Sequence, residues 1–310
     1  MRSAAAWPRR FRISPVAEQL FKRLVIIGIG HIGASIARTL QTAPGVVKTL
    51  VISDTSPAHL ARAKELGLGA EYFADPGEAA EGADGVILCT PVGSFAAIAE
   101  AIAPRLAPGC ILSDVGSTKQ SVWRDVGPFV PEGVQFVPAH PLAGTEFSGP
   151  DAGLPDLFKG RWCLLTPAED ADAAAVRKVE AFWTALGART AKMTAAHHDR
   201  VIAIVSHLPH LIAFTICGTA DDLADETRDE VLQFAASGFR DFTRIAASDP
   251  VMWRDIFINN KDALLEMFSR FSEDAQAMAR AVRWGDTGYI EDKINRSRKI
   301  RKSLIDIKQA

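Results

Sequence analysis

The chain has 310 residues, of which 48% are hydrophobic and 23% charged, and its formal net charge is -2. This length exceeds the size at which a single hydrophobic core usually stops growing, so we expect two domains. The near-neutral charge gives no reason to expect nucleic acid or an anionic membrane as a partner. No apolar run approaches the roughly 18 residues of a membrane span, and the four cysteines form no CxxC pair, which favours a cytoplasmic protein with reduced thiols.

The chain begins with a basic stretch, "MRSAAAWPRRFRISPVAEQLF", whose apolar core "AAAW" is too short for a secretory signal peptide. We expect residues 1–20 to form a flexible basic extension ahead of the folded domains. A transit peptide would have a similar composition, and the sequence leaves that alternative open.

Residues 21–193 alternate short apolar runs with helix-like stretches. Several runs are nearly continuous in β-branched residues, as in strands that are buried on both faces of a parallel sheet. This alternation predicts an α/β fold, a Rossmann-type domain with a doubly wound, mostly parallel sheet. The expected strands are 23–28, 49–54, 85–90, 110–115, 135–140, 162–167 and 189–193, and the expected helices are 32–43, 57–66, 93–106, 119–129 and 171–186.

After residue 193 the strand-like runs cease. Long helical patterns follow at about 194–220, 225–247, 250–283 and 286–308, so residues 194–310 should form an all-helical domain. The apolar run "VIAIVSHLPHLIAFTIC" is either the buried core helix of that domain or a surface for self-association. The basic C-terminal stretch "KINRSRKIRKSLIDIKQA" is typical of the solvated face of a terminal helix.

A glycine-rich loop follows the first expected strand. Alone, a GxGxxG pattern is weak, but this one opens an expected helix and is followed by Asp54 at the end of the next strand, which makes it specific for a dinucleotide. The helix N-terminus offers unpaired N–H groups to the phosphates, and Asp54 would bind the ribose hydroxyls and repel a 2′-phosphate, so NAD is preferred over NADP. The loop comprises Gly28, Ile29, Gly30, His31, Ile32 and Gly33.

Two later loops end strands that should flank the cofactor crevice. "CTPVG" contains Thr90 and Pro91, and "SDVGSTK" contains Ser117. Ligands of open α/β sheets bind beyond the carboxyl ends of the strands, so we expect all three residues to contact the cofactor. Ser117 or Thr118 should also cap the helix that follows.

A histidine follows the strand-like run "QFVPAH". We expect His140 at the carboxyl end of a later strand of the same sheet, facing the nicotinamide crevice. Because the unperturbed pKa of histidine is close to 6.5, His140 suits a base that takes a proton from an alcohol while hydride leaves the same carbon. A purely structural histidine at a strand-to-loop corner is the alternative.

The helical domain contributes a second polar cluster in "VSHLPHLIAF", which holds Ser206, His207 and His210. Residues three or four apart share a helix face, and Pro209 should kink the helix and free backbone carbonyls. We predict no metal site, because no cysteine or convergent carboxylate stands at ligand spacing from the nearby histidines, His197, His198, His207 and His210.

Further on, "GFRDFTRIAASDPVMWRD" places Arg240 and Arg244 four residues apart amid apolar residues. Partly buried arginines need anionic partners, and a guanidinium binds a carboxylate with two hydrogen bonds. The partner could be a substrate carboxylate, or one of the neighbouring aspartates Asp241, Asp249 and Asp255.

Taken in this order, "GIGHIG", "DVGSTK", "HPLAGTE", "SHLPH" and "GFRDFTRIAASDPVMW" resemble the prephenate dehydrogenase family, which comprises prephenate, arogenate and cyclohexadienyl dehydrogenases. The resemblance runs from about residue 21 to about residue 306. It implies a Rossmann domain, a helical substrate and dimerisation domain, a homodimer, and oxidative decarboxylation of a cyclohexadienol with NAD.

The resemblance also implies roles for individual residues. His140 would be the base on the ring hydroxyl, and Ser117 would hydrogen-bond that hydroxyl or His140, with His210 as a third catalytic residue. The remaining motif residues would bind or orient the substrate, with Arg244 favoured over Arg240 for a carboxylate: Thr145, Glu146, Ser206, His207, Arg240 and Arg244.

Some questions stay open at the level of sequence. A 3-hydroxyacid-type dehydrogenase would need a lysine in the helical domain, for which Lys261 is the candidate, and a non-catalytic NAD-binding sensor would have no use for His140. Too few residues flank the family-like region for a fused mutase or regulatory domain, so tyrosine feedback would have to act at the active site. The choice between prephenate and arogenate rests on pocket contacts that spacing does not locate.

Overall fold

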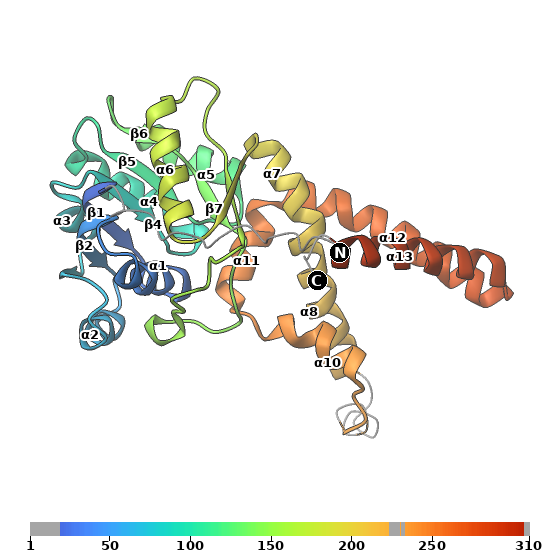
Figure 1. Cartoon of the computed structure of the whole chain (residues 1–310). Coiled ribbons are helices and arrows are strands. Elements are labelled where there is room, and N and C mark those ends of the chain that lie inside the picture. Colours follow the sequence, from blue (N-terminus) through green and yellow to red (C-terminus); the bar gives the residue numbers. More distant parts are fainter. Residues whose placement is uncertain (1–18, 223–229, 231–232, 307–310) are drawn as a thin grey trace, which may run out of the picture.

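The computed structural model describes residues 19–222, 230 and 233–306, so most of the basic 1–20 extension lies outside it. The first domain is built on a six-stranded parallel sheet of order β3-β2-β1-β4-β5-β6 (Figure 1). Its central strands are buried on both faces, as their continuous apolar runs predicted. The strands are β1 (Phe21–Ile27), β2 (Val47–Ser53), β3 (Glu71–Phe73), β4 (Gly85–Leu88), β5 (Ile111–Asp114) and β6 (Gln135–Phe136).

Helices cover both faces of this sheet and give the doubly wound fold that the sequence predicted. One core layer contains Ile26, Ile36 and Trp183, and the other contains Phe95 and Val122. The short β3 and α3 were not expected from the sequence pattern. The helices are α1 (His31–Thr42), α2 (Pro57–Glu65), α3 (Pro76–Ala80), α4 (Phe95–Ile102), α5 (Lys119–Val126) and α6 (Ala173–Ala185), with 3-10 turns at Val92–Ser94, Ala103–Arg105, Gly127–Phe129 and Pro150–Ala152.

The expectation that His140 ends a strand of this same sheet is wrong. The run 135–140 is divided between two sheets, and β7 (Ala139–Pro141) lies in a second sheet with β8 (Trp162–Leu165) and β9 (Arg189–Lys192). The Val137 N–H still bonds to β5 at Leu112, but Pro138 has no N–H to continue the ladder. The Pro138 carbonyl instead accepts from Thr166, and β7 pairs antiparallel with β8.

The second domain is helical, and its α12–α13 pair projects away from the sheet (Figure 1). The helix expected at 250–283 is two helices, because the chain turns at Asn260, and part of the helix expected at 225–247 lies outside the described residues. The elements are α7 (Ala195–Ile202), a π-helical turn (Ala203–His207), α8 (Leu208–Asp221), α10 (Ser237–Thr243), a 3-10 turn (Arg244–Ala247), α11 (Pro250–Asn259), α12 (Lys261–Trp284) and α13 (Thr287–Asp306).

Elements α7 and α8 join through the π turn into one helical run, Ala195–Asp221. By length and composition this run could span a membrane, contrary to the expectation that no segment would approach one. Although it contains polar residues, an 18-residue window of this run has a mean hydropathy of 1.8. Only 28% of that window is buried within this chain. The buried side of this helix carries the polar residues His198, Asp199 and His207 beside apolar ones, while Ile204 and Val205 are exposed among the described residues.

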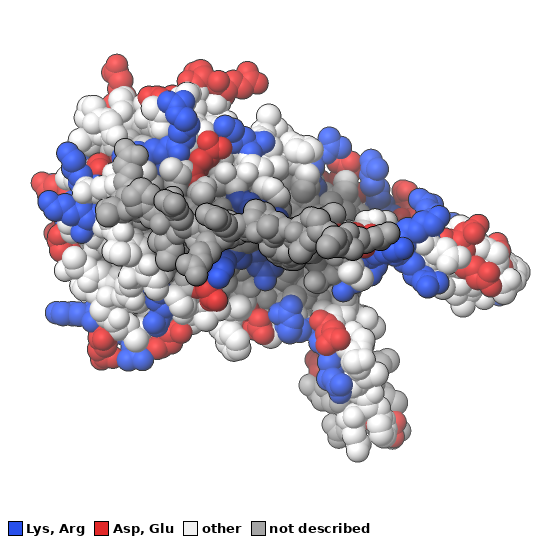
Figure 2. Space-filling view, viewed as in Figure 1, with Lys and Arg blue, Asp and Glu red and all other residues white. Residues whose placement is uncertain are grey.

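Basic and acidic side chains are interspersed over the visible face of the Rossmann domain (Figure 2). The small net charge of the chain arises from nearly equal numbers of basic and acidic residues, 35 Lys and Arg against 37 Asp and Glu.

Candidate active site

The glycine loop has the backbone geometry that a bound dinucleotide requires. Gly28 has φ +99°, and an added Cβ there would lie 2.7 Å from Thr90 Cγ2, while at Gly33 it would lie 2.1 Å from the Gly28 carbonyl oxygen. At Gly30 an added Cβ would meet no atom within 4 Å. The first and third glycines are thus fixed by packing, and the second leaves open the approach that a pyrophosphate would use.

Asp54 is held directly against this loop. Its Oδ2 accepts from the Ile29 N–H at 2.9 Å and its Oδ1 from the Ser56 N–H at 2.8 Å. The His59 ring lies 3.6 Å from Oδ1. A carboxylate fixed in this way at the end of β2 retains lone pairs for the two hydroxyls of an adenosine ribose.

His140 begins a chain of buried hydrogen bonds between the two domains. Its Nδ1 lies 2.8 Å from Nε2 of His198 in α7, and Nδ1 of His198 lies 2.8 Å from Oδ1 of Asp199. His198 and Asp199 are fully buried, and His140 is 8% exposed. Sequence reasoning considered His198 only as a metal ligand and overlooked Asp199.

The order of donors in this chain identifies the reactive atom of His140. A carboxylate can only accept, so Nδ1 of His198 carries the proton and its Nε2 is an acceptor. Nδ1 of His140 must then donate to that acceptor, which leaves the lone pair on Nε2 of His140. Burial, followed by unfavourable electrostatic interactions with His198, Lys119 and His207, lowers the pKa of His140 well below its usual value, so the ring is a neutral base at neutral pH.

Asp199 also caps α5, a role that the sequence assigned to Ser117 or Thr118. Its two carboxylate oxygens accept from the N–H groups of Lys119 and Gln120, at 2.7 and 2.9 Å. Thr118 occupies the N-cap position without a side-chain cap bond. Although burial alone would raise the pKa of Asp199, the bond from His198 and these backbone donors lower it, so the carboxylate is charged.

A buried ion pair holds the residue before His140. The Lys119 ammonium bonds to the Asp114 carboxylate and donates to the Ala139 carbonyl at 2.7 Å, and the Ala139 N–H donates to Asp114 at 3.2 Å. Burial lowers the pKa of Lys119 against the attraction of Asp114. Both backbone polar groups of Ala139, the residue before His140, are therefore held by the ion pair.

The histidines of "SHLPH" occupy two different environments. His207 is fully buried, and its Nδ1 accepts from the Asn260 amide at 3.0 Å. Burial lowers the pKa of His207 to about 3, and its ring is enclosed within the chain, whereas the sequence predicts it at the substrate pocket. His210 is partly buried; its ring stacks on Trp253 at a centroid distance of 3.6 Å, and its Nδ1 bonds to the Ser206 carbonyl.

The two arginines are also distinct. Arg244 reaches across the domain boundary and donates to Glu146 at 3.2 Å, whereas Arg240 bonds to the Ala235 carbonyl. The Arg244 side chain is 61% exposed, so its fork is available to a further anion. Thr145 is exposed, and its hydroxyl accepts from the Phe147 N–H. Among the aspartates considered as partners, Asp249 caps α11 and Asp255 pairs with Arg254.

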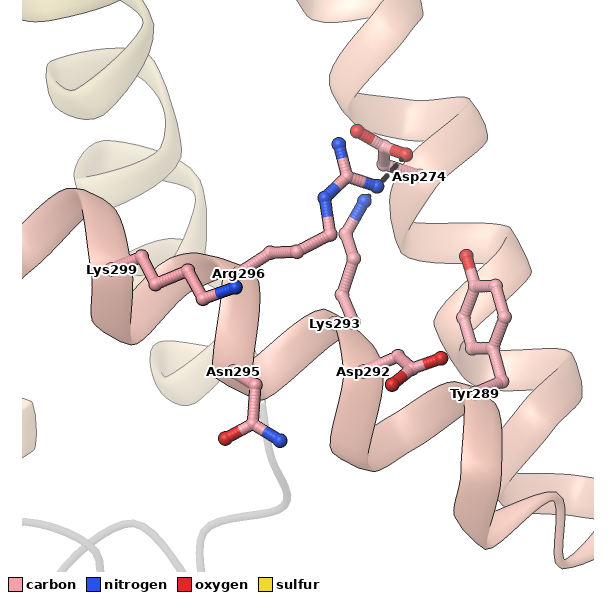
Figure 3. A pocket seen from close by; sticks show the side chains of 7 residues that line it. All are labelled: Asp274, Tyr289, Asp292, Lys293, Asn295, Arg296 and Lys299. Atoms are coloured by element: carbon pink, nitrogen blue, oxygen red, sulfur yellow. Dashed lines mark hydrogen bonds and ion pairs between the residues drawn. The ribbon is translucent and has the colours of Figure 1, made fainter.

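A separate cavity lies between α12 and α13 (Figure 3). It has a volume of about 420 Å³, and Asp274, Tyr289, Lys293 and Arg296 are among its lining residues. Lys261, the alternative catalytic lysine, is an exposed residue at the start of α12. Neither is part of the cluster around His140.

Comparisons with known proteins identify the family of this chain. Residues 36–192 match the family "Prephenate dehydrogenase, nucleotide-binding domain" and residues 194–295 its "dimerization domain". The chain is 38% identical to a cyclohexadienyl dehydrogenase of Zymomonas mobilis over 286 residues, covering 92% of this chain and 97% of the relative. The chain belongs to the prephenate dehydrogenase family.

Two further members support the assignment. A prephenate dehydrogenase of Bacillus subtilis is 32% identical over 275 residues, which cover 87% of this chain and 72% of the relative. The crystal structure of prephenate dehydrogenase from A. aeolicus, in complex with hydroxyphenyl propionate and NAD+, aligns with a TM-score of 0.84 and 31% identity, over 92% of this chain and 98% of that one. The predicted family, fold class and NAD cofactor are confirmed, and the chain is an NAD-dependent dehydrogenase.

Proposed function

We propose that this chain oxidises prephenate with NAD, with loss of the ring carboxylate as CO2 and formation of 4-hydroxyphenylpyruvate. Arogenate, which carries an amine in place of the keto group, would give tyrosine. The observation that carries the proposal is the His140–His198–Asp199 chain, which leaves an unprotonated Nε2 on His140. The names of the relatives add support, because they include prephenate and cyclohexadienyl dehydrogenases.

The reaction divides into one proton transfer, one hydride transfer and one bond cleavage. Nε2 of His140 takes the proton of the ring 4-hydroxyl. Bound at the glycine loop, NAD would supply the acceptor for the hydride that leaves the ring carbon bearing this hydroxyl. The dienone so formed breaks its bond to the ring carboxylate, which leaves as CO2, and the electron pair of that bond completes the aromatic ring. The former carbonyl oxygen then takes the proton back from Nε2 of His140. Because aromatisation makes this cleavage strongly downhill, the side chains mainly position the substrate and deprotonate it.

The other residues have supporting roles in this proposal. Ser117, half-buried at the loop after β5, hydrogen-bonds the ring hydroxyl or His140. Arg244 binds a substrate carboxylate, and Glu146 holds the guanidinium until that carboxylate arrives. His210, stacked on Trp253, presents its free ring nitrogen to the substrate beside Ser206. We rank three residues as secondary candidates for substrate binding, because their described hydrogen bonds are to other groups of this chain: Arg240, Thr145 and His207.

The cofactor contacts follow from the glycine loop. We propose that residues 28–33, Thr90, Pro91 and Ser117 contact NAD, and that Asp54 disfavours the 2′-phosphate of NADP. The domain boundaries that we propose are 21–193 for the NAD-binding domain and 194–310 for the helical domain. A cytoplasmic homodimer that contacts through the helical domain completes the proposal, in line with the family description of that domain.

The reaction is tested by the absorbance of the reduced nicotinamide, with NAD or NADP and with prephenate or arogenate. We expect turnover with prephenate and NAD, and the ratio to arogenate measures the side-chain preference. Protein that binds NAD yet turns over neither substrate would contradict the proposal.

The base is tested separately with His140→Asn. We expect kcat to fall by about 10²–10⁴, the usual contribution of a general base. Binding of NAD, measured by calorimetry, should be unchanged, because His140 lies outside the glycine loop. His197→Asn is the matched control, since His197 is an exposed histidine on α7. Near-wild-type turnover of the folded, NAD-binding variant would remove His140 from its role.

A further inference from the structure

The segment that follows His140 is tied along one face of the cofactor helix. Three side chains of α1, spaced four residues apart, bond to the backbone of residues 152–155: His31 Nδ1 with the Ala152 carbonyl at 2.7 Å, Ser35 Oγ with the Leu154 N–H at 3.0 Å, and Thr39 Oγ1 with the Pro155 carbonyl at 2.9 Å. Residues at this spacing share a helix face, so the contacts form one line. We call residues 142–155 the strap.

Backbone packing adds to these hydrogen bonds. A Cβ added at Gly153 would lie 2.7 Å from Ala34 Cβ, so the strap lies directly on α1. Asp151 accepts from Arg62 of α2 at 2.8 Å, but that pair is exposed and contributes little. The end of the strap is thus fixed to α1 chiefly by buried and half-buried contacts.

The other end of the strap belongs to the substrate side. It begins two residues after His140, and Glu146 within it bonds to Arg244 of the helical domain. One short segment therefore connects the base, the substrate arginine and the helix whose first turn receives the dinucleotide phosphates. A displacement of α1 or of the strap at their contact would therefore alter both the dinucleotide site and the substrate site.

His31 stands where this contact meets the cofactor loop. It is the first residue of α1 and follows Gly30, whose outer side is open. The Ala152 carbonyl can only accept, so Nδ1 of His31 carries the proton, and its Nε2 is buried without a partner in the described part of the chain. Burial lowers the pKa of His31, against the bond to Ala152, and keeps the ring neutral.

We propose that His31 is a positioning residue that transmits occupancy of the NAD site to the strap through its bond to Ala152. The inference rests on the proposed function only in naming Arg244 and Glu146 as substrate contacts. NAD that settles on the first turn of α1 fixes His31, His31 fixes Ala152, and the strap then holds Glu146 at the substrate site. Couplings of this kind usually change affinity about 5- to 150-fold.

The test uses hydrogen exchange of the strap amides with and without NAD, in the full chain and without substrate. His31→Asn places an amide near the position of Nδ1 and can still donate to Ala152, whereas His31→Gln places it near the position of Nε2. Gln41→Ala is the matched control, because Gln41 also bonds from α1 to a backbone carbonyl, that of Gly67, away from the strap. Calorimetry sets equal NAD occupancy for every variant.

We expect saturating NAD to slow exchange of the strap amides by about fivefold or more in the wild type, in His31→Asn and in Gln41→Ala, and to leave it unchanged in His31→Gln. No slowing in the wild type, full slowing in His31→Gln, or loss in both His31 variants would overturn the proposal. Turnover of prephenate does not enter this measurement, so failure of the proposed reaction and failure of the coupling are separately visible.

Discussion

At the scale of single residues, the reactivity of His140 is set by its hydrogen bonds and its burial. The Asp199 carboxylate fixes the tautomer of His198, which in turn fixes that of His140. Desolvation disfavours the charged ring, so the base is deprotonated at neutral pH, at the expense of some intrinsic basicity. Such a base is ready for use but weaker than a solvent-exposed histidine.

The pH dependence of catalysis follows from this shift. His140 must be neutral to act, and its folded pKa is lowered, so kcat/KM should stay constant as the pH falls to about 6.5 and decline only at lower pH. The pH profile of kcat/KM measures this directly. An acidic limb centred at or above the ordinary histidine pKa would contradict the assignment.

Replacing both partners of the buried pair, with Asp114→Asn and Lys119→Met, provides the complementary measurement. The Lys119 charge lowers the pKa of His140, so its removal should move the acidic limb of the profile toward higher pH. Both partners are changed together, because removing one alone leaves a buried unpaired charge that costs about 3–5 kcal/mol.

At the scale of elements, the irregular turn between α7 and α8 places the polar cluster. The π-helical turn Ala203–His207 precedes Pro209, which lies in the first turn of α8 and cannot donate a backbone hydrogen bond. A π turn inserts a residue into the helical repeat, so His207 points toward Asn260 while His210 reaches Trp253.

We predict that Pro209→Ala regularises this helix. The free energy of unfolding should rise, or at least not fall, since proline inside a helix costs about 3 kcal/mol. Because the register of Ser206 and His210 would change, kcat/KM should fall tenfold or more at the same time. Urea unfolding and steady-state kinetics on one preparation check both parts. An unchanged kcat/KM would show that the π-helical turn is not needed for catalysis.

At the scale of the whole molecule, the helical domain exposes apolar side chains that the described residues of one chain leave uncovered. Leu265, Phe268 and Phe271 recur every third residue on α12, at 57%, 36% and 38% exposure, and the outer side of Ala195–Asp221 is also open. Burial of such apolar surface contributes about 25 cal/mol of free energy per Å², which favours association. In the homodimer that we propose, a second copy would cover this apolar helix, which by length and composition could also span a membrane.

We predict a solution mass about twice the 33.4 kDa of one chain. Leu265→Glu, which places a charge on the exposed apolar face, should shift the protein toward the monomer. Lys64→Glu on α2 of the Rossmann domain is the control and should leave the dimer intact. Light scattering coupled to size exclusion gives the masses, and a monomeric wild type would contradict the homodimer.

The sequence by itself determined the fold class and the family. Buried runs and turn chemistry along the chain predict the α/β domain and the glycine loop with Asp54, whereas the roles proposed for His140 and for the motif residues from Ser117 to Arg244 come mainly from the resemblance to the family. Tertiary structure alone decided that β7 leaves the main sheet at Pro138 and that Asp199 caps a helix of the other domain. It also decided that the Lys119 ammonium donates to the Ala139 carbonyl. These contacts join residues far apart in the chain, and no local spacing encodes a partner that folding brings into place.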